Sequence, residues 1–348
     1  MTKFHKLTIQ KIIKETSDSV SILFSIPESL KDKFAFTAGQ YINLKKEIKG
    51  EELRRAYSIC SSPQSKQLKV AVKAVKNGKF SVFATTKLAK GDQLEVTVPE
   101  GRFTIHPKNA KNYIGFAAGS GITPIIAMIK SVLESSNSSF TLIYGNKSIA
   151  DSIFYNELNT LQNKYAKRFK LHYVFSRERN SNSLFGRIDK TSVNRFIKNT
   201  YKGTSFDKAF LCGPEEMIKT VSDTLEENGI AKESIYFELF TTSSLSEENT
   251  KPAKDKQTKA TIVLDDQQIV FDMKQSDNIL AASLRNKIDA PYSCQGGVCS
   301  SCIALITHGS AIMTKKSVLS QEEVDQGYVL TCIAYPKTAE ITVNYDEA

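Results

Sequence analysis

Residues 292–302, Tyr-Ser-Cys-Gln-Gly-Gly-Val-Cys-Ser-Ser-Cys, contain three of the six cysteines of this 348-residue chain. Gly296 and Gly297 lie between the first two of them, and glycine tolerates a positive φ and lets backbone N–H groups approach a ligand closely. A fourth cysteine follows after 29 intervening residues. The four cysteines of this pattern are Cys294, Cys299, Cys302 and Cys332. The stretch predicts a tight loop around a small group that is bound through sulfur.

The spacing C-x4-C-x2-C with a distant fourth cysteine is the plant-type pattern for ligands of a [2Fe–2S] cluster. Structural zinc usually takes two C-x2-C-like pairs or mixed Cys/His pairs. Here only Cys299 and Cys302 form such a pair, and the nearest histidine, His308, is badly spaced for zinc. So few cysteines and the lack of a secretory signal disfavour a disulfide framework. We therefore expect the four cysteines to hold an iron–sulfur cluster, in a cytoplasmic protein.

The residues around this loop predict a small β-rich domain. ATIVLDDQQIVFDM (260–273) alternates like two strands joined by a turn at Asp265-Asp266, and EITVNY (340–345) predicts a last strand. NILAASLRNKI (278–288) predicts a short helix before the cysteine loop. Together with the four ligand positions, this stretch of about ninety residues resembles a plant-type ferredoxin.

Charge is unevenly distributed along the chain. Residues 259–348 carry 7 Lys and Arg against 11 Asp and Glu, whereas the whole chain carries 47 against 37, so the first 258 residues hold 40 basic and 26 acidic side chains. An acidic module joined to a basic one favours mutual docking or a basic site for an anionic cofactor. No dense basic run with interleaved aromatics and no apolar run of 18 residues occurs, so neither nucleic acid binding nor a membrane span is predicted.

The predicted secondary structure of the rest of the chain changes once, after residue 106. Up to residue 106 the sequence predicts short strands separated by glycines, which favours a barrel or a sandwich. From residue 107, apolar strands such as YIGFAA (113–118) alternate with helices, which favours a parallel sheet. We expect a multidomain protein with an antiparallel β-barrel at 1–106, an α/β parallel-sheet domain at 107–240, a polar linker at 241–258 and an α+β, β-grasp-like domain at 259–348.

Two motifs in the predicted barrel suit a flavin. Arg55, Tyr57 and Ser58 form R-x-Y-S: a guanidinium can hold a phosphate, an aromatic ring can stack on a flat cofactor, and a hydroxyl can bond its polar edge. Alone, this motif would equally suit an ordinary amphipathic strand. Gly78 begins G-K-F-S before a predicted helix, and a glycine turn at a helix N-terminus is an anion site.

Two turns in the α/β part suit a dinucleotide. The run 119–124, Gly-Ser-Gly-Ile-Thr-Pro, departs from G-x-G-x-x-G because Pro124 replaces the last glycine. Its two glycines still permit close backbone approach, and the helix that follows offers free N–H groups to a pyrophosphate. Cys212-Gly213-Pro214 ends another predicted strand.

The barrel, R-x-Y-S, G-x-x-S and the α/β part together resemble the ferredoxin–NADP⁺ reductase superfamily, here with a ferredoxin domain at the C-terminus. The resemblance spans essentially the whole chain. It implies that Arg55 binds the FAD phosphate, Tyr57 lies against the isoalloxazine ring and Ser58 contacts the flavin near its reactive nitrogen. The pyrophosphate stretch favours FAD, although some relatives bind FMN.

The same resemblance implies the remaining site residues. Val72 and Lys73 would line the ring and ribityl region, and Cys212 would lie beside the nicotinamide. Glu238 and Phe240 end the reductase part, which in relatives approaches the flavin. The expected catalytic residues are Ser58, Cys212 and Glu238. The expected cofactor-binding residues are Arg55, Tyr57, Ser58, Val72, Lys73, Gly78, Phe80, Ser81, Gly119, Gly121, Thr123, Ser176, Arg177, Cys212, Gly213, Pro214 and Phe240.

NADPH is the expected nucleotide. Ser176 and Arg177 follow the predicted strand FKLHYVF (169–175), and a hydroxyl with a guanidinium can hold a 2′-phosphate. NAD-specific sites usually place a carboxylate there for the ribose hydroxyls. Glu178 follows directly, but the Ser-Arg pair matches the NADP-type pattern of the family.

These expectations describe a reductase in which NADPH delivers two electrons to FAD and the cluster passes them on singly. The domain order, with RAYSICSSP (55–63), resembles the reductase component of the phenylacetyl-CoA epoxidase system and related multicomponent oxygenases, which would place the chain in phenylacetate catabolism. Reductases for acyl desaturases, alkane hydroxylases and hybrid-cluster proteins share this order. An oxygenase or desaturase is therefore the expected acceptor.

Two other classes of function stay open. A relay subunit without its own reaction, as in dihydroorotate dehydrogenases, is disfavoured because those subunits have a much shorter cysteine-bearing end. A redox-sensing regulator is disfavoured because no DNA-binding helical module is predicted.

Overall fold

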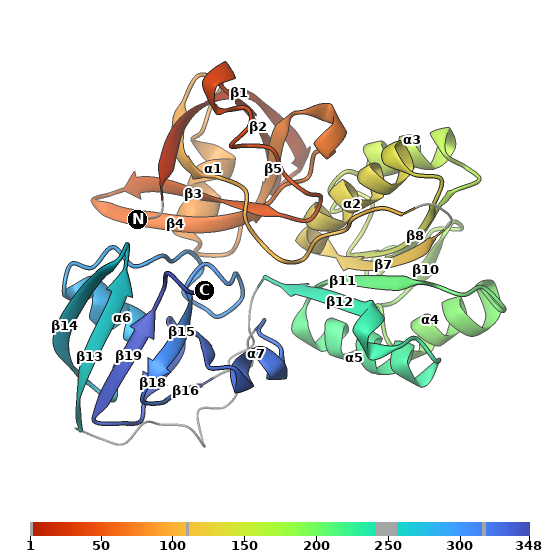
Figure 1. The fold of residues 1–348 in the computed structure, drawn as a ribbon. Coiled ribbons are helices and arrows are strands. Elements are labelled where there is room, and N and C mark those ends of the chain that lie inside the picture. The colour runs from red at the N-terminus through yellow and green to blue at the C-terminus, as the bar shows by residue number, and fades with distance from the viewer. Residues whose placement is uncertain (1–2, 109–110, 241–255, 315–317) are drawn as a thin grey trace. The chain divides into compact units, whose positions relative to one another are not determined.

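The computed structural model describes residues 3–108, 111–240, 256–314 and 318–348 (Figure 1). Its described part forms two compact units, Phe4–Phe240 and a second unit that begins at residue 256 and runs to Ala348. Most of the predicted linker, residues 241–255, lies outside the described residues. A strand begins at Gln257, which lies within the predicted linker range 241–258.

The first half of the Phe4–Phe240 unit is an antiparallel sheet in the order β4-β3-β6-β1-β2-β5. Ile59, just after β4, bridges Val70 of β5, and this contact joins the two ends of the order into a barrel. Alternating side chains of every strand fill its core. The strands are β1 (Phe4–Thr16), β2 (Ser19–Ser25), β3 (Tyr41–Ile48), β4 (Glu51–Ser58), β5 (Leu68–Lys73) and β6 (Gln93–Thr97). The helix α1 (Lys79–Thr86) follows β5.

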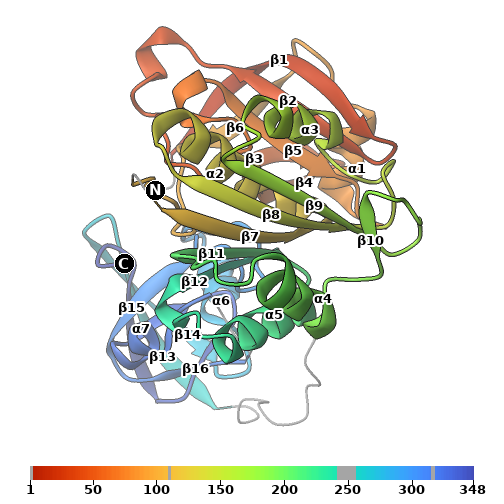
Figure 2. The same ribbon diagram turned by 90° about the vertical axis from the view of Figure 1, so that its right-hand side faces the viewer.

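The second half is a parallel sheet in the order β10-β9-β8-β7-β11-β12. Figures 1 and 2 show α2 and α3 on one face of this sheet and α4 and α5 on the other. The strands are β7 (Asn112–Ala118), β8 (Ser139–Asn146), β9 (Phe169–Phe175), β10 (Ser183–Phe185), β11 (Lys208–Gly213) and β12 (Ile235–Leu239). The helices are α2 (Ile122–Ser135), α3 (Tyr155–Lys164), α4 (Lys190–Asn194) and α5 (Glu215–Glu227).

The helix α2 has hardly any exposed side. Twelve of its 14 residues are buried, and its apolar side chains share one core with the parallel sheet and with barrel residues such as Cys60 and Ala71. Gly39, in the loop before β3, has a φ of +102°, and a Cβ there would lie 2.0 Å from the carbonyl oxygen of Phe103 and 2.6 Å from Cε of Met128 in α2. Only glycine allows this close approach of the barrel loop to the helix.

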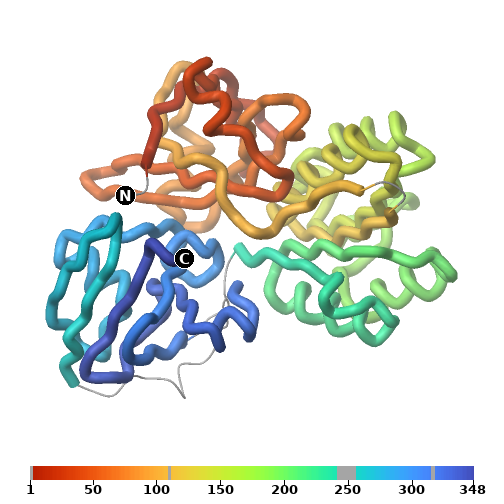
Figure 3. The backbone as a smooth tube through the Cα atoms, viewed as in Figure 1, coloured from red at the N-terminus to blue at the C-terminus, as the bar shows by residue number. Residues whose placement is uncertain are grey.

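The second unit contains a five-stranded mixed sheet in the order β14-β13-β19-β15-β17, with α6 (Ile279–Arg285) in its core. The hairpin of β13 and β14 is seen in Figure 3, and its turn residues Asp265 and Asp266 both have positive φ, as a tight hairpin turn requires. The strands of the sheet are β13 (Gln257–Leu264), β14 (Gln267–Lys274), β15 (Ile303–His308), β17 (Tyr328–Leu330) and β19 (Glu340–Asn344). A separate pair consists of β16 (Ala311–Met313) and β18 (Ala334–Pro336), and α7 spans Gln321–Asp325.

The predicted fold class is confirmed, and the elements that sequence analysis did not identify are the short ones. They include β10, α4 with the π-helical turn Arg195–Thr200, and the elements from β16 to β18. Three to six residues contain too little periodicity to reveal a strand or a helix. Among the helices that the structure describes, none has both the length and the apolar character needed to cross a lipid bilayer.

Candidate functional site

The predicted nucleotide-binding residues gather at the carboxyl edge of the parallel sheet. Gly119 follows β7, Ser176 follows β9 and Gly213 ends β11, and these strands all run in the same direction. Ligands of open α/β sheets bind at this edge. The structure thus brings together three turns that lie far apart in the sequence.

The two glycines of the Gly119–Gly121 turn have different roles. Gly119 has a φ of +56° and nothing within 4 Å of the position of a Cβ, so its surroundings leave room for a ligand. A Cβ on Gly121 would lie 2.1 Å from the carbonyl oxygen of Cys212. Gly121 therefore allows the turn to pack against β11, a reason that the sequence motif did not reveal.

The start of α2 is open to an anion. No side chain of the described residues caps it, and the Thr123 hydroxyl donates to the Ser120 carbonyl oxygen at 3.1 Å. Thr123 is itself buried, so its hydroxyl shapes the turn. The Gly119–Gly121 turn runs directly into α2, and the Ile122 N–H donates to the Gly119 and Ser120 carbonyl oxygens. The N–H groups and the positive end of the helix dipole that suit a pyrophosphate therefore lie at the turn itself.

Ser58, Cys212 and Glu238, the three predicted catalytic residues, lie together. Cys212 and Glu238 are register partners on the parallel strands β11 and β12, and the Ser58 hydroxyl at the end of β4 donates to Glu238 Oε2 at 3.3 Å. The barrel and the parallel sheet therefore meet at this carboxyl group. Phe240, just after β12, is half-buried against the shared core.

Burial favours the neutral forms of the Glu238 and Cys212 side chains. Burial raises the pKa of Glu238 to about 8, although the hydrogen bond from Ser58 opposes the shift. Burial, and then the neighbouring Glu238, raise the pKa of Cys212 well above its usual value. At neutral pH the site holds a carboxylic acid and a thiol, which can donate a proton but not act as a thiolate nucleophile.

The flavin-binding prediction concerns the strand β4 and the helix α1. Arg55 and Tyr57 are half-buried, and the ring centroids of Tyr57 and Phe80 lie 5.7 Å apart. Val72 points into the barrel core, and Lys73 Nζ lies 3.5 Å from Asp18. The Val72 side chain is therefore unavailable to a ligand, and Lys73 has an ion-pair partner within the barrel.

The start of α1 has the features of an anion site. Gly78 precedes it, and no side chain of the described residues caps it. The Ser81 hydroxyl accepts the backbone N–H of Val75 at 3.1 Å, and a Cβ on Gly78 would lie 2.4 Å from that hydroxyl oxygen. A Cβ at position 78 would therefore crowd this hydrogen bond, and Ser81 keeps its own proton to donate.

Ser176 and Arg177 follow β9 as predicted. The Ser176 backbone N–H donates to the Asn146 carbonyl oxygen at 2.9 Å, which ties the turn to the end of β8. Glu178 Oε2 accepts the backbone N–H of Ile149 at 2.9 Å, so one of its two carboxylate oxygens is engaged within the protein. Arg179 stacks 4.0 Å from the ring centroid of Phe185.

Sequence reasoning missed two residues at this edge. The Tyr144 hydroxyl donates to the Gly119 carbonyl oxygen at 3.1 Å and so holds the nucleotide turn. Asn146 Nδ2 is buried, and the Asn146 side chain lies against the Tyr144 hydroxyl, so the two side chains support this turn together. Their signal was available, since both are polar side chains near the carboxyl end of a predicted parallel strand.

Several residues of the cysteine loop in the second unit have positive φ. Gln295 and Ser300 have φ values of 53° and 54°, and Gly297 has a φ of 79°. The left-handed region is costly for residues other than glycine and is typical of functional loops. The Gly296 N–H donates to Cys294 Sγ at 3.4 Å and the Cys294 N–H to Cys299 Sγ at 3.5 Å, so backbone dipoles point at the sulfurs.

The four predicted ligands form two pairs. A hydrogen bond from the Cys299 thiol lowers the pKa of Cys294 to about 6, and one from Cys332 lowers the pKa of Cys302. No group of three or more Cys, His, Asp or Glu side chains in the described ranges is placed to hold one metal ion. Two pairs fit a two-iron cluster, in which each iron takes two protein ligands, better than a single tetrahedral zinc.

Ser293, which sequence analysis overlooked, also fits a bound cluster. Its hydroxyl is buried next to Cys294 and has no hydrogen-bond partner among the described residues. A buried hydroxyl is costly without a partner, and a cluster sulfur is an acceptor of this kind. The donors present at this loop are therefore consistent with an iron–sulfur group.

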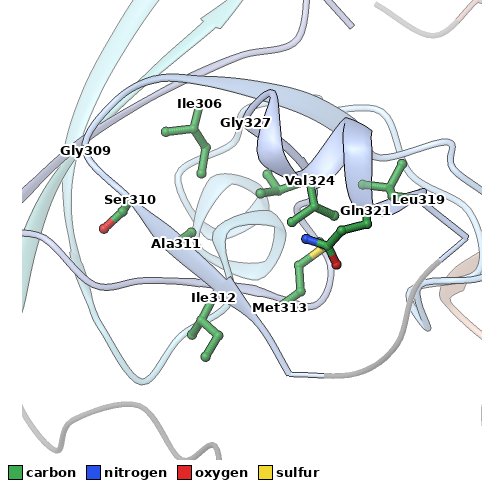
Figure 4. Close-up of a pocket in the computed structure, with 11 residues that line it drawn as sticks. Ile306, Gly309, Ser310, Ala311, Ile312, Met313, Leu319, Gln321, Val324 and Gly327 are labelled. Carbon is green, nitrogen blue, oxygen red and sulfur yellow. The ribbon is translucent and has the colours of Figure 1, made fainter.

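A cavity of about 660 Å³ also lies in the second unit (Figure 4). Apolar side chains such as Ile306, Met313 and Val324 surround it, and none of the four cysteines lines it. It is therefore separate from the predicted cluster site.

Three family models match the chain in succession. They describe an oxidoreductase FAD-binding domain at residues 6–105, an oxidoreductase NAD-binding domain at 116–223 and a 2Fe-2S iron-sulfur cluster binding domain at 262–337. These matches agree with the kinds of site that the barrel, the parallel sheet and the cysteine loop offer.

Curated relatives match over nearly the full length. The chain is 38% identical over 352 residues to one of the subunits of 1,2-phenylacetyl-CoA epoxidase from Escherichia coli strain K12, with 99% of each chain covered. It is 31% identical over 353 residues to the ferredoxin reductase component of 3-ketosteroid-9-alpha-monooxygenase from Rhodococcus rhodochrous, with 97% of this chain and 96% of that protein covered.

Solved structures share the fold. Phthalate dioxygenase reductase matches with a TM-score of 0.61 and 23% identity over 98% of both chains. An intact type IV self-sufficient cytochrome P450 monooxygenase matches with a TM-score of 0.72 and 20% identity, over 98% of this chain and 41% of that one. By its full-length relatives and its three domains, the chain belongs to the ferredoxin–NADP⁺ reductase superfamily, as an NAD(P)H oxidoreductase with a C-terminal plant-type [2Fe–2S] domain.

Proposed function

We propose that this chain is a cytoplasmic, NADPH-dependent reductase that delivers single electrons through FAD and a [2Fe–2S] cluster to an oxygenase. The observation that carries the proposal is the meeting of Ser58 with Cys212 and Glu238, because it joins the flavin strand to the nucleotide edge. When bound, FAD accepts a hydride from the nicotinamide and gives up electrons singly to the cluster.

In this proposal, the residues of the chain bind FAD and the nucleotide and orient them. Arg55 and the start of α1 hold the FAD phosphates, and Tyr57 covers the ring. The Gly119–Gly121 turn and the start of α2 hold the pyrophosphate of the nucleotide. Glu238 keeps a proton beside the Ser58 hydroxyl, because burial raises the pKa of this carboxyl group.

The preference for NADPH rests on the turn after β9. Arg177 offers a guanidinium, and Ser176 a hydroxyl, to a 2′-phosphate. Glu178 is the carboxylate in this turn, and the Ile149 backbone N–H, which donates to its Oε2, competes with ribose hydroxyls for that oxygen. A turn with a cation and an engaged carboxylate favours the phosphorylated nucleotide.

An oxygenase of the phenylacetyl-CoA epoxidase type is the proposed acceptor. The full-length relative at 38% identity belongs to that epoxidase, and the relative at 31% is the reductase component of a monooxygenase. Desaturases, alkane hydroxylases and hybrid-cluster proteins are the alternative acceptors, and a fixed relay subunit is the alternative role.

Replacement of Arg177 by Gln tests the nucleotide preference. We expect kcat/KM for NADPH to fall roughly 10- to 100-fold, since a hydrogen bond to a charged group contributes about 1.5–3 kcal/mol. The value for NADH should stay unchanged and serves as the control. The measurement is steady-state reduction of ferricyanide. Equal kcat/KM values for the two nucleotides in the unsubstituted protein would contradict the assignment.

Glu238→Gln tests the protonated carboxyl group through stability. The folded pKa of about 8 lies above the ordinary value of 4.5, so the folded state binds this proton more tightly. Its stabilising contribution is full below pH 4.5 and is lost as the pH rises through 8. Between about pH 4.5 and 8, where the folded state holds this proton and the unfolded state has lost it, Tm should therefore fall more steeply in the unsubstituted protein than in the variant. Parallel Tm profiles in calorimetry would show that Glu238 has an ordinary pKa.

The acceptor is tested by reconstitution with the purified oxygenase component of a phenylacetyl-CoA epoxidase. NADPH should support epoxide formation only when this chain is present. Cys332→Ser should abolish that turnover but keep ferricyanide reduction, because ferricyanide takes electrons directly from the flavin. Epoxide formation at the background rate, with efficient transfer to a desaturase instead, would overturn the proposed partner.

A further inference from the structure

A lysine lies buried where the barrel meets the nucleotide domain. Lys130, in the middle of α2, has a side chain only 8% exposed. Its Nζ donates to the Cys60 carbonyl oxygen at 3.0 Å and lies 2.5 Å from Glu157 Oε1. A buried ammonium group is very costly unless it is paired and hydrogen-bonded. Lys130 satisfies this requirement by contacting one group from each domain.

Glu157, in the nucleotide domain, also pairs with a lysine of the barrel. It lies in the first turn of α3, and its second carboxylate oxygen is 3.6 Å from Nζ of Lys69 in the barrel strand β5. Burial alone would raise the pKa of Glu157, but the ammonium groups of Lys130 and Lys69 outweigh burial and lower it. The carboxylate is therefore ionised at neutral pH, and one charge from the barrel and one from α2 share it.

Two further contacts support the same junction. The ammonium groups of Lys69 and Lys130 lie 5.5 and 6.0 Å from the ring centroid of Phe154, a distance at which cation–π attraction acts. The Ser62 hydroxyl, from the turn after Cys60, donates to Glu134 near the end of α2. Polar contacts thus cross the junction at two points along α2.

The junction joins the elements that carry both predicted cofactor sites. Cys60 follows Ser58 by two residues, and Lys69 belongs to the strand that closes the barrel on β4. The helix that carries Lys130 begins at the Gly119–Gly121 turn, about 12 Å away along the helix axis. A shift at the junction would therefore move the flavin strand relative to the nucleotide turn.

Hydride transfer is sensitive to such a shift. The reacting atoms must approach to about 3–3.5 Å, and a misplacement of about 1 Å can lower a rate by about 100-fold. Apolar packing around α2 sets the approximate orientation, but apolar contacts are not directional. Hydrogen-bonded charges fix direction and register.

We propose that Lys69, Glu157 and Lys130 form an interdomain clamp that positions the nicotinamide-binding turn against the flavin strand. The clamp residues are positioning residues, since none lies among the predicted cofactor contacts. This inference rests on the proposed function, because the geometry that it sets is that of hydride transfer from NADPH to FAD.

Lys69→Met tests the clamp in the full-length holoprotein. This variant removes the charge contributed by the barrel but leaves Glu157 paired with Lys130, so no buried charge is stranded. In stopped-flow reduction by NADPH we expect the limiting rate of flavin reduction to fall roughly tenfold, with nucleotide Kd and flavin content unchanged. Lys69→Arg keeps the positive charge and should restore the rate.

Hydrogen–deuterium exchange gives a readout that does not depend on turnover. In Lys69→Met, exchange should become faster in residues 59–65 and in α2. Glu227→Gln is the matched control, since Lys190 and Glu227 form an ion pair of 2.7 Å within the nucleotide domain alone. It should change neither the exchange at the junction nor the limiting rate.

Three results separate the possibilities. An unchanged limiting rate and unchanged exchange in Lys69→Met would overturn the clamp. A slower rate that Lys69→Arg does not restore would also overturn it, because charge would then not be the cause. Absence of flavin reduction by NADPH in the unsubstituted protein would overturn the proposed function, and the exchange measurement would still test the clamp.

Discussion

The burial of α2 between the parallel sheet and the barrel is the constraint on which the rest of the reductase unit depends. A helix that both domains bury cannot shift without opening their common core, so the two domains pack as one compact unit. The start of this helix faces the nucleotide edge, and its middle carries Lys130 against the barrel. Packing therefore joins two binding sites that the chain encodes separately, and Ser58 meets Glu238 as a consequence.

The iron–sulfur unit depends on a different constraint, the geometry of one short loop. Gln295 and Ser300 adopt a left-handed backbone at some energetic cost, and the strands and α6 around the loop hold it in that shape. In return, the loop directs N–H groups at the sulfurs and separates the cysteines into two pairs. A bound cluster explains the buried polar groups at this loop, since its sulfurs can accept their hydrogen bonds. It also explains why the loop keeps a costly left-handed backbone, which is typical of functional sites.

The fold and most of the candidate site could be predicted from sequence because their signals are local. Strand alternation, the glycine turns and the cysteine spacing each occupy a few consecutive residues. What could not be predicted depends on contacts between distant segments. Gly121 proved necessary for packing against Cys212, Val72 proved to be a core residue, and the pairing of Glu157 with Lys69 joins elements that lie far apart in the sequence. A single sequence contains no signal for such pairs.

The central claim is that paired electrons from a nucleotide leave this chain singly through its cluster. Anaerobic titration of the purified protein with NADPH, followed by visible absorption and by iron analysis, tests it most directly. The account predicts FAD and iron in a ratio of about 1:2 and bleaching of both the flavin and the iron–sulfur absorption. A protein without flavin and iron after reconstitution, or one whose flavin is reduced while its cluster stays oxidised, would contradict the account.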